Sequence, residues 1–212
     1  MRIGIFGGSF NPIHKGHVRL AQALCKAGLV DEIWLMVSPL NPLKQNNQSE
    51  LLENELRLRL AQLATTNISC LKASDFEFHL PVPSYTITTL SELQKAYPHH
   101  TFSLVVGEDN WQRFSRWYKS DEIRAHHDII VYGRKENVES AGKTENTENM
   151  EGNGIVTVHH KDGKDETYEG FLLYNISSTQ IREALRNGNF TFARRWLHPD
   201  VYRYIRQHKL YL

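Results

Sequence analysis

The sequence predicts an α/β fold, a single domain with a doubly wound parallel sheet, and two observations carry this prediction. Short apolar runs typical of buried strands alternate with segments whose apolar residues recur every three or four positions, as in helices. The chain has 212 residues, which suits one domain with a sizeable core over the whole range 1–212. Ligands of such sheets gather beyond the carboxyl ends of the strands. One cleft should therefore be shared by the segments 7–17, 38–44, 107–117 and 133–134.

The first strand is expected at 3–6, where an apolar run meets Gly7-Gly8. A helix should begin near Pro12, whose fixed φ suits a first turn, and stop at Gly28. The second strand is expected at 33–37. Two prolines then force a loop over 38–44.

The next helix is expected from Ser49, its cap, to Ala64. Its buried stripe is Leu52, Leu56, Leu60 and Leu63. A third strand is expected at 68–71, followed by a short extended piece that contains Phe76 and Phe78. The segment 83–86 opens another helix, and its inner stripe is Ile87, Leu90 and Leu93.

Strands four and five are expected at 102–106 and 129–132. Residues 136–154 are polar and rich in Asn, Glu and Gly, which indicates a flexible surface insertion. Extended pieces at 155–159 and 170–174 flank a predicted hairpin turn over 161–164. A helix should open over 176–182 and end near Arg186, and a last helix should start at Pro199. That last helix is expected to bury Val201, Tyr204 and Ile205.

Charge and apolar content exclude several classes of protein. The chain carries 25 basic and 24 acidic residues, so nothing indicates a nucleic-acid groove. No apolar run approaches the roughly 18 residues that span a bilayer, and no signal peptide precedes the first strand. Cys25 and Cys70 are isolated, which predicts free thiols in a reducing cytoplasm and gives no support for zinc. We therefore expect a cytoplasmic protein without a membrane or nucleic-acid partner.

The first seventeen residues indicate an anion site. Gly7-Gly8 lets the backbone approach a ligand closely, and a helix that begins near Pro12 places His14 and His17 on one face of its first turn. The free N–H groups and the positive dipole end of that turn favour an anion. Two imidazoles at the same place suit a polyphosphate.

A second helix start shows the same kind of chemistry. Ser177 and Gln180 have the spacing of a capping box, and capping alone would explain the hydroxyl groups of this segment. Arg182 follows one turn later. The arginine makes this turn a candidate for holding phosphates.

Both segments resemble motifs of the nucleotidyltransferase α/β-phosphodiesterase superfamily. Residues 9–17 are similar to its T/SxxPxHxGH signature, and 176–182 match its ISSTxxR element. The resemblance implies a Rossmann-like sheet of the nucleotidyltransferase type with C-terminal helices, and catalytic roles for His14, His17 and Arg182. The implied ATP-binding positions are Gly7, Gly8, Ser9, Phe10, His14, His17, Gly107, Asp109, Ser178, Thr179 and Arg182.

Motifs in the middle of the chain resemble those of one family within this superfamily. Residues 83–86, 107–109 and 117–118 look like those of the bacterial nicotinate-nucleotide adenylyltransferases, and the similarity covers nearly the whole chain except 136–154. The family's reaction joins ATP and nicotinate mononucleotide to give deamido-NAD and pyrophosphate in NAD biosynthesis, with Mg²⁺ bound to the ATP phosphates and no dedicated protein metal site. The expected mononucleotide-binding residues are Ser84, Tyr85, Thr86, Asp109, Trp117, Lys44 and Arg134.

Local chemistry agrees with this choice of acceptor. If Ser84 caps a helix, the N–H groups near Tyr85 and Thr86 point outward as donors, which suits a carboxylate better than a carboxamide. Trp117 can stack on the pyridinium ring, although a groove aromatic that only packs is the alternative. Lys44 and Arg134 are candidates for the mononucleotide phosphate.

Asp109 has two interpretations: it accepts hydrogen bonds from ribose hydroxyls, or it merely caps the helix that follows. We expect direct in-line attack of the mononucleotide phosphate on the α-phosphorus, because no Cys, Ser or Lys stands in an activating arrangement. Two rival functions stay open, a non-catalytic nucleotide sensor and a transferase acting on nicotinamide mononucleotide or phosphopantetheine. A homo-oligomer is possible.

Overall fold

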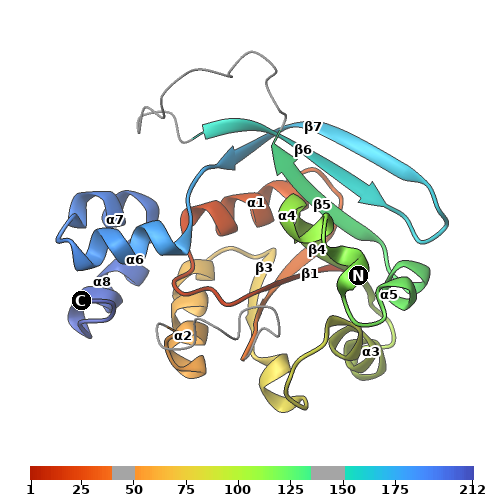
Figure 1. Cartoon of the computed structure of the whole chain (residues 1–212), viewed down its shortest axis with the longest axis horizontal. Helices are drawn as coiled ribbons and strands as arrows, with labels where there is room; N and C mark the ends of the chain where they lie inside the picture. Colours follow the sequence, from red (N-terminus) through yellow and green to blue (C-terminus); the bar gives the residue numbers. More distant parts are fainter. Residues whose placement is uncertain (40–50, 135–150) are drawn as a thin grey trace.

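A seven-stranded sheet runs through the molecule in the order β3-β2-β1-β4-β5-β6-β7 (Figure 1). This computed structural model describes residues 1–39, 51–134 and 151–212. The parallel part consists of β1 (Arg2–Gly8), β2 (Glu32–Val37), β3 (Leu71–Ser74), β4 (Thr101–Gly107) and β5 (Ile129–Arg134). The chain therefore has the predicted doubly wound α/β fold, with β1 at its centre.

Side chains of the parallel strands alternate between two cores, one on each face of the sheet. Phe6 of β1 packs with α1 (Lys15–Lys26), α2 (Asn54–Thr65) and the C-terminal helices. Ile3 and Ile5 point to the opposite face, where α3 (Thr86–Ala96) and α5 (Ser120–His126) pack. Strands covered on both sides need apolar residues throughout, which is why they appear in the sequence as short apolar runs.

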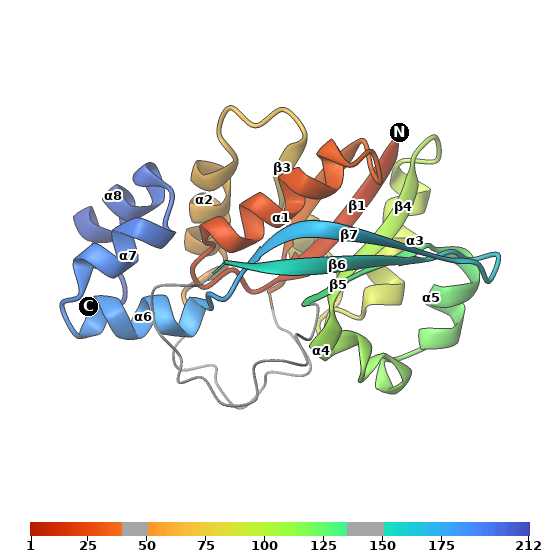
Figure 2. The same cartoon turned by 90° about the horizontal axis from the view of Figure 1, so that it is seen from above.

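An antiparallel hairpin extends the sheet beyond β5. It consists of β6 (Glu151–His159) and β7 (Asp165–Tyr174), joined by the predicted turn. The chain then enters α6 (Ser178–Arg186), α7 (Phe190–Trp196) and α8 (Pro199–Gln207). These three helices lie at one end of the molecule beside α2 (Figure 2). No helix in the described part of the chain is both long and apolar enough to cross a membrane.

The first two helices begin later than predicted. Helix α1 starts at Lys15 instead of near Pro12, because His14 is extended (φ −141°, ψ 169°) and serves as the N-cap. Helix α2 starts at Asn54, and the expected cap Ser49 lies outside the described residues. Of the predicted buried stripe only Leu60 is fully buried, whereas Leu52, Leu56 and Leu63 are partly buried.

Two further predictions around β3 are wrong. The strand spans Leu71–Ser74 instead of 68–71, because Asn67 has a positive φ (66°) and two turn hydrogen bonds occupy the backbone between Thr65 and Leu71. The segment after it is a short 3₁₀ helix, η2 (Phe76–His79), instead of an extended piece.

In the second half, residues 151–154 belong to β6 instead of the expected insertion, and the rest of that insertion, 136–150, lies outside the described residues. Tyr204 is only partly buried, unlike Val201 and Ile205. The sequence pattern did not predict η3 (Phe114–Arg116), α5 or α7, and a helix near Asp109 was expected only as one alternative, where the structure has α4 (Glu108–Trp111).

Candidate functional site

The starts of α1 and α6 lie close together, as expected if the two candidate phosphate sites hold one ligand. The Ser178 hydroxyl donates a hydrogen bond to the Pro12 carbonyl at 2.8 Å. The Arg182 guanidinium donates to the Asn11 carbonyl at 2.9 Å. Segments about 170 positions apart in the sequence thus form one rim at the end of β1.

The loop between β1 and α1 is also held by two hydrogen bonds to the Asn11 side chain. The Asn11 side-chain oxygen accepts hydrogen bonds from the Tyr211 hydroxyl at 2.7 Å and from the Leu52 N–H at 3.3 Å. Burial raises the pKa of Tyr211 well above its usual range, so this phenol stays a neutral donor. The last residues of the chain therefore fix the loop that carries the first motif, a role that no sequence pattern indicated.

His14 and His17 form a stacked pair, with ring centroids 3.6 Å apart and planes inclined by 21°. The backbone N–H of His14 donates a hydrogen bond to Nδ1 of the His17 ring at 3.3 Å. A neutral His17 therefore carries its proton on Nε2. Burial lowers the pKa of His14 to about 3. His14 is thus neutral at pH 7 and contributes hydrogen bonding instead of charge.

The glycines and Phe10 shape the backbone around this pair. Space above Gly7 is open, since a Cβ there would meet nothing within 4 Å. A Cβ on Gly16 would lie 2.9 Å from Ile176 Cγ2 and 3.0 Å from His14 Nδ1, so no larger residue fits without displacing them. Phe10 has a positive φ (44°), and its buried ring packs edge-on against His17 at 5.1 Å. The Phe10 ring therefore packs against His17 and limits the positions that the imidazole can take.

Helix α6 begins as predicted. Ser177 is its N-cap and forms a reciprocal capping box with Gln180. The hydroxyls of Ser178 and Thr179 are therefore not used for capping. Thr179 Oγ1 accepts a hydrogen bond from Arg182 at 3.3 Å. The arginine head is thereby held between the two helix starts.

A second wall of the site is made where β4 and β5 end. A Cβ on Gly107 would lie 3.2 Å from the Tyr132 ring and hydroxyl. Burial, and secondarily the charge of nearby Asp109, raises the pKa of Tyr132 to about 12. Asp109 itself is exposed in α4, whose N-cap is Gly107 without a side-chain cap. The interpretation of Asp109 as a helix cap is therefore wrong.

The residues expected around the mononucleotide ring also come together. The Tyr85 and Tyr118 rings lie 4.8 Å apart, which joins the start of α3 to the segment of Trp117. Trp117 packs against Phe114 at 5.2 Å and buries its indole N–H, which has no hydrogen-bond partner among the described residues.

The start of α3 differs from the prediction at Ser84. Tyr85, not Ser84, is the N-cap, and no side chain caps the helix. The first turn, from Thr86 onward, therefore keeps N–H groups without side-chain acceptors. The Ser84 hydroxyl oxygen is buried and also lacks a hydrogen-bond partner in the described ranges.

Two predicted phosphate ligands cannot be placed. Lys44 lies outside the described residues. Arg134 is the last residue of β5, and only its backbone is described. The strand order places the ends of β2, β1, β4 and β5 side by side, so the segments 7–17, 107–117 and 133–134 lie at one edge of the sheet, while 40–44 lies outside the described residues and the shared cleft stays a prediction.

Two buried charged residues beneath the site were not indicated by any pattern in the sequence. Arg57 of α2 is fully buried and donates to the Ser9 carbonyl at 2.7 Å and the Ser38 carbonyl at 2.8 Å. Glu77 is also buried. Burial raises the pKa of its carboxyl group, and hydrogen bonds from Ser38 and Thr89 partly offset this rise. A helical Arg and a Glu between two phenylalanines look like ordinary surface residues, so no local pattern distinguishes them.

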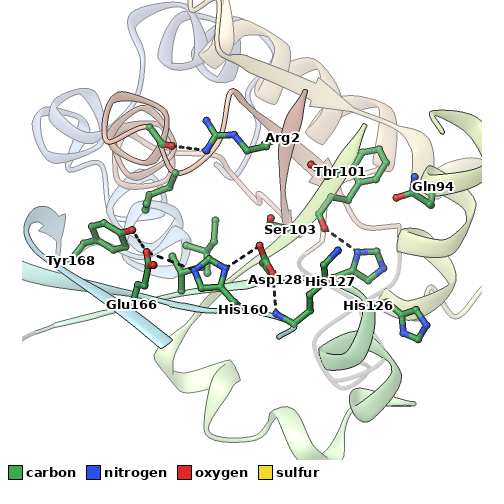
Figure 3. A pocket seen from close by; sticks show the side chains of 16 residues that line it. Arg2, Gln94, Thr101, Ser103, His126, His127, Asp128, His160, Glu166 and Tyr168 are labelled. Carbon is green, nitrogen blue, oxygen red and sulfur yellow. Dashed lines mark hydrogen bonds and ion pairs between the residues drawn. The ribbon is translucent and has the colours of Figure 1, made fainter. Parts of the chain in front are cut away.

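A cavity of about 350 Å³ lies elsewhere, beside the amino ends of the parallel strands. Arg2 of β1, Thr101 of β4 and Asp128, the residue before β5, line it (Figure 3). His160 bridges Asp128 at 3.3 Å and Glu166 at 3.7 Å across its floor. Because β1 carries Arg2 at its start and Gly7-Gly8 at its end, this cavity is separate from the two helix starts.

The site offers hydrogen-bond donors more than metal ligands. Within the described ranges, no three His, Cys, Asp or Glu side chains gather in a way that could hold a metal ion. Histidine N–H groups, a guanidinium and hydroxyls instead surround the end of β1. This donor set suits a polyphosphate.

Comparison with known proteins agrees with this geometry. Residues 5–184 match the family model described as cytidylyltransferase-like. A probable nicotinate-nucleotide adenylyltransferase of Bacteroides fragilis is 45% identical over 206 residues, 97% of this chain and 92% of that protein. Its counterpart in Bacteroides thetaiotaomicron is 44% identical over 98% of this chain and 92% of that protein.

Solved structures share the fold at low sequence identity. The Plasmodium falciparum nicotinic acid mononucleotide adenylyltransferase in complex with NaAD superposes with a TM-score of 0.68 at 21% identity, covering 99% of this chain and 97% of that one. A Vibrio parahaemolyticus structure described as a putative nicotinate-nucleotide adenylyltransferase gives 0.66 at 22% identity, covering 99% and 94%.

Proposed function

Because the chain belongs to the cytidylyltransferase-like family and, within it, to the nicotinate-nucleotide adenylyltransferases, we propose that it transfers the adenylyl group of ATP to nicotinate mononucleotide. The products are deamido-NAD and pyrophosphate, and the reaction belongs to NAD biosynthesis. The observation that carries this proposal is the contact of the two helix starts through Ser178 and Arg182. One triphosphate can reach both.

The reaction needs positioning and charge compensation more than a nucleophilic side chain. A phosphate oxygen of the mononucleotide attacks the α-phosphorus of ATP in line, and the bond to the bridging oxygen of pyrophosphate breaks. The attacking oxygen is already anionic near pH 7, so no protein base is required. His17 donates from Nε2 to phosphate oxygens, and Arg182 with Ser178 and Thr179 holds the β and γ phosphates.

His14 acts differently from His17 in this arrangement. Its burial and low pKa keep it neutral, so it offers one N–H to a phosphate oxygen and holds His17 through its backbone N–H. Mg²⁺ enters with ATP as part of the substrate, where it offsets phosphate charge.

The acceptor side of the site lies at the start of α3 and at Trp117. The uncapped first turn that begins at Thr86 and the unpartnered Ser84 hydroxyl suit an acceptor-only carboxylate. Trp117 stacks on the pyridinium ring, Asp109 accepts from ribose hydroxyls, and Lys44 and Arg134 bind the mononucleotide phosphate. A cytoplasmic location suits this substrate and the free thiols of Cys25 and Cys70.

A substrate panel tests the proposal. The enzyme with MgATP is offered nicotinate mononucleotide, nicotinamide mononucleotide or phosphopantetheine, and pyrophosphate release is measured. We expect the highest kcat/KM with nicotinate mononucleotide. A higher value with either other acceptor would contradict the proposed substrate, and ATP binding without pyrophosphate release from any pair would indicate a nucleotide sensor.

A further inference from the structure

A chain of buried hydrogen bonds connects the loop after β1 with the start of α3. Arg57 Nη1 joins the Ser9 carbonyl to the Ser38 carbonyl, at 2.7 and 2.8 Å. The Ser38 hydroxyl, just after β2, donates to Glu77 Oε2 at 2.7 Å. The two loops are thus tied to each other and to the carboxylate of η2.

Glu77 continues the connection to α3. Its other oxygen, Oε1, accepts a hydrogen bond from Thr89 Oγ1 at 2.9 Å. Thr89 lies in the first turns of α3, and its hydroxyl is also 3.4 Å from the carbonyl of Tyr85, the N-cap. The carboxylate therefore bridges the end of β2 and the beginning of α3.

The environment of Glu77 makes this bridge specific. Glu77 is 7% exposed and Thr89 is 1% exposed, so water cannot replace a lost partner cheaply. A carboxylate accepts only, and here each oxygen receives one hydroxyl. Such an arrangement fixes the distance between the two hydroxyls and, with it, the distance between the elements that carry them.

From this geometry we infer that Glu77 is a positioning residue that sets the start of α3 relative to the end of β2, so that a bound mononucleotide meets ATP in line. The inference rests on the proposed function, which places the acceptor at residues 84–86. Glu77 itself lies beneath the site and acts through Thr89. Its loss should therefore weaken acceptor binding more than ATP binding.

A pair of matched substitutions tests the inference. Thr89→Val removes the hydroxyl that Glu77 holds, at nearly constant volume. Thr65→Val is the control, because Thr65 is a buried α2 residue whose hydroxyl, within the described part of the chain, donates only to carbonyls of its own helix, Ala61 at 3.0 Å and Gln62 at 3.2 Å. Steady-state kinetics with MgATP and nicotinate mononucleotide give a KM for each substrate, and urea unfolding gives the stability of each variant.

We expect Thr89→Val to raise the KM for the mononucleotide about tenfold, the effect of roughly one lost buried hydrogen bond. The KM for ATP should stay within about twofold, since Arg57 still holds Ser9. Thr65→Val should leave both KM values unchanged. Equal KM values for the two variants, or an equal rise in KM for both substrates in Thr89→Val, would overturn the inference.

Substitutions of Glu77 itself complete the test. Glu77→Gln keeps both hydrogen bonds, because the hydroxyls can donate or accept, so its KM values should resemble those of the wild type. Glu77→Leu loses both, and adding Thr89→Val to it should raise the mononucleotide KM no further. Additive effects in the double variant would overturn the inference, and if Glu77→Leu does not fold, the two threonine variants decide.

The outcomes separate this inference from the proposed function. A wild-type enzyme that prefers another acceptor would refute the proposed substrate, and the same KM comparison would then be made with that acceptor. A wild-type enzyme with the proposed activity but without the expected difference between Thr89→Val and Thr65→Val would refute only the role of Glu77.

Discussion

Replacement of Arg57 by methionine should destabilise the protein, and the structure allows the size of the effect to be worked out. Three backbone carbonyls would lose a charged donor: Ser9 at 2.7 Å, Ser38 at 2.8 Å and Leu52 at 2.9 Å. Hydrogen bonds to a charged group contribute about 1.5–3 kcal/mol each, so the loss from these three is about 4.5–9 kcal/mol before any compensation. A fourth bond, to the Asn54 side-chain oxygen at 2.5 Å, is lost as well.

The opposing effect is the free-energy cost of burying the guanidinium. Burial lowers the pKa of Arg57, although the nearby Tyr211 and Glu55 shift this pKa upward. Removing a buried charge recovers several kcal/mol, and methionine fills much of the same volume at similar helix propensity. The net loss in free energy of unfolding should therefore be about 3 kcal/mol.

Urea unfolding followed by tryptophan fluorescence measures this loss. Arg59→Met is the matched control, because Arg59 is an exposed residue on the same helix, and it should change stability by no more than about 0.5 kcal/mol. Arg57→Lys should fall between the two, since one ammonium cannot reproduce the planar fork of a guanidinium. Arg57→Met with a stability within about 1 kcal/mol of the wild type would refute the reasoning and show that desolvation outweighs the hydrogen bonds.

Three further outcomes test the histidines and Trp117. His17→Ala should lower kcat at least about 10²-fold, because a donor to the transition state is lost; a correctly folded variant with near-normal kcat would remove His17 from the mechanism. Between pH 7 and 5 the unfolded chain protonates His14 while the folded protein, with its pKa near 3, does not, so this residue alone should reduce stability by about 2 kcal/mol as the pH falls. His14→Asn should lack that part of the decrease in urea unfolding, and an unchanged pH dependence would contradict the burial argument. Trp117→Ala should raise the mononucleotide KM about tenfold and Trp117→Phe less, as expected for cation–π stacking; equal effects on the KM for ATP would favour a packing role.

Local sequence was sufficient for most strands of the sheet and for the two motifs at 9–17 and 176–182. Strands β1, β2, β4 and β5 are apolar because both faces of the parallel sheet are covered. The start of α6 was predicted because capping depends on two residues three positions apart. Where a turn intervened, as at Asn67 before β3, the apolar pattern misplaced the boundary.

The sequence by itself determined the fold class, the family and the start of α6, since strand patterns, family motifs and helix caps each depend on residues close together in the chain. Only the tertiary structure revealed the buried network of Arg57 and Glu77, the clamp of Tyr211 on Asn11, and the neutral state of His14. These features depend on partners distant in sequence and on exclusion of water. Burial and long-range hydrogen bonding arise when the chain folds, and no local pattern encodes them.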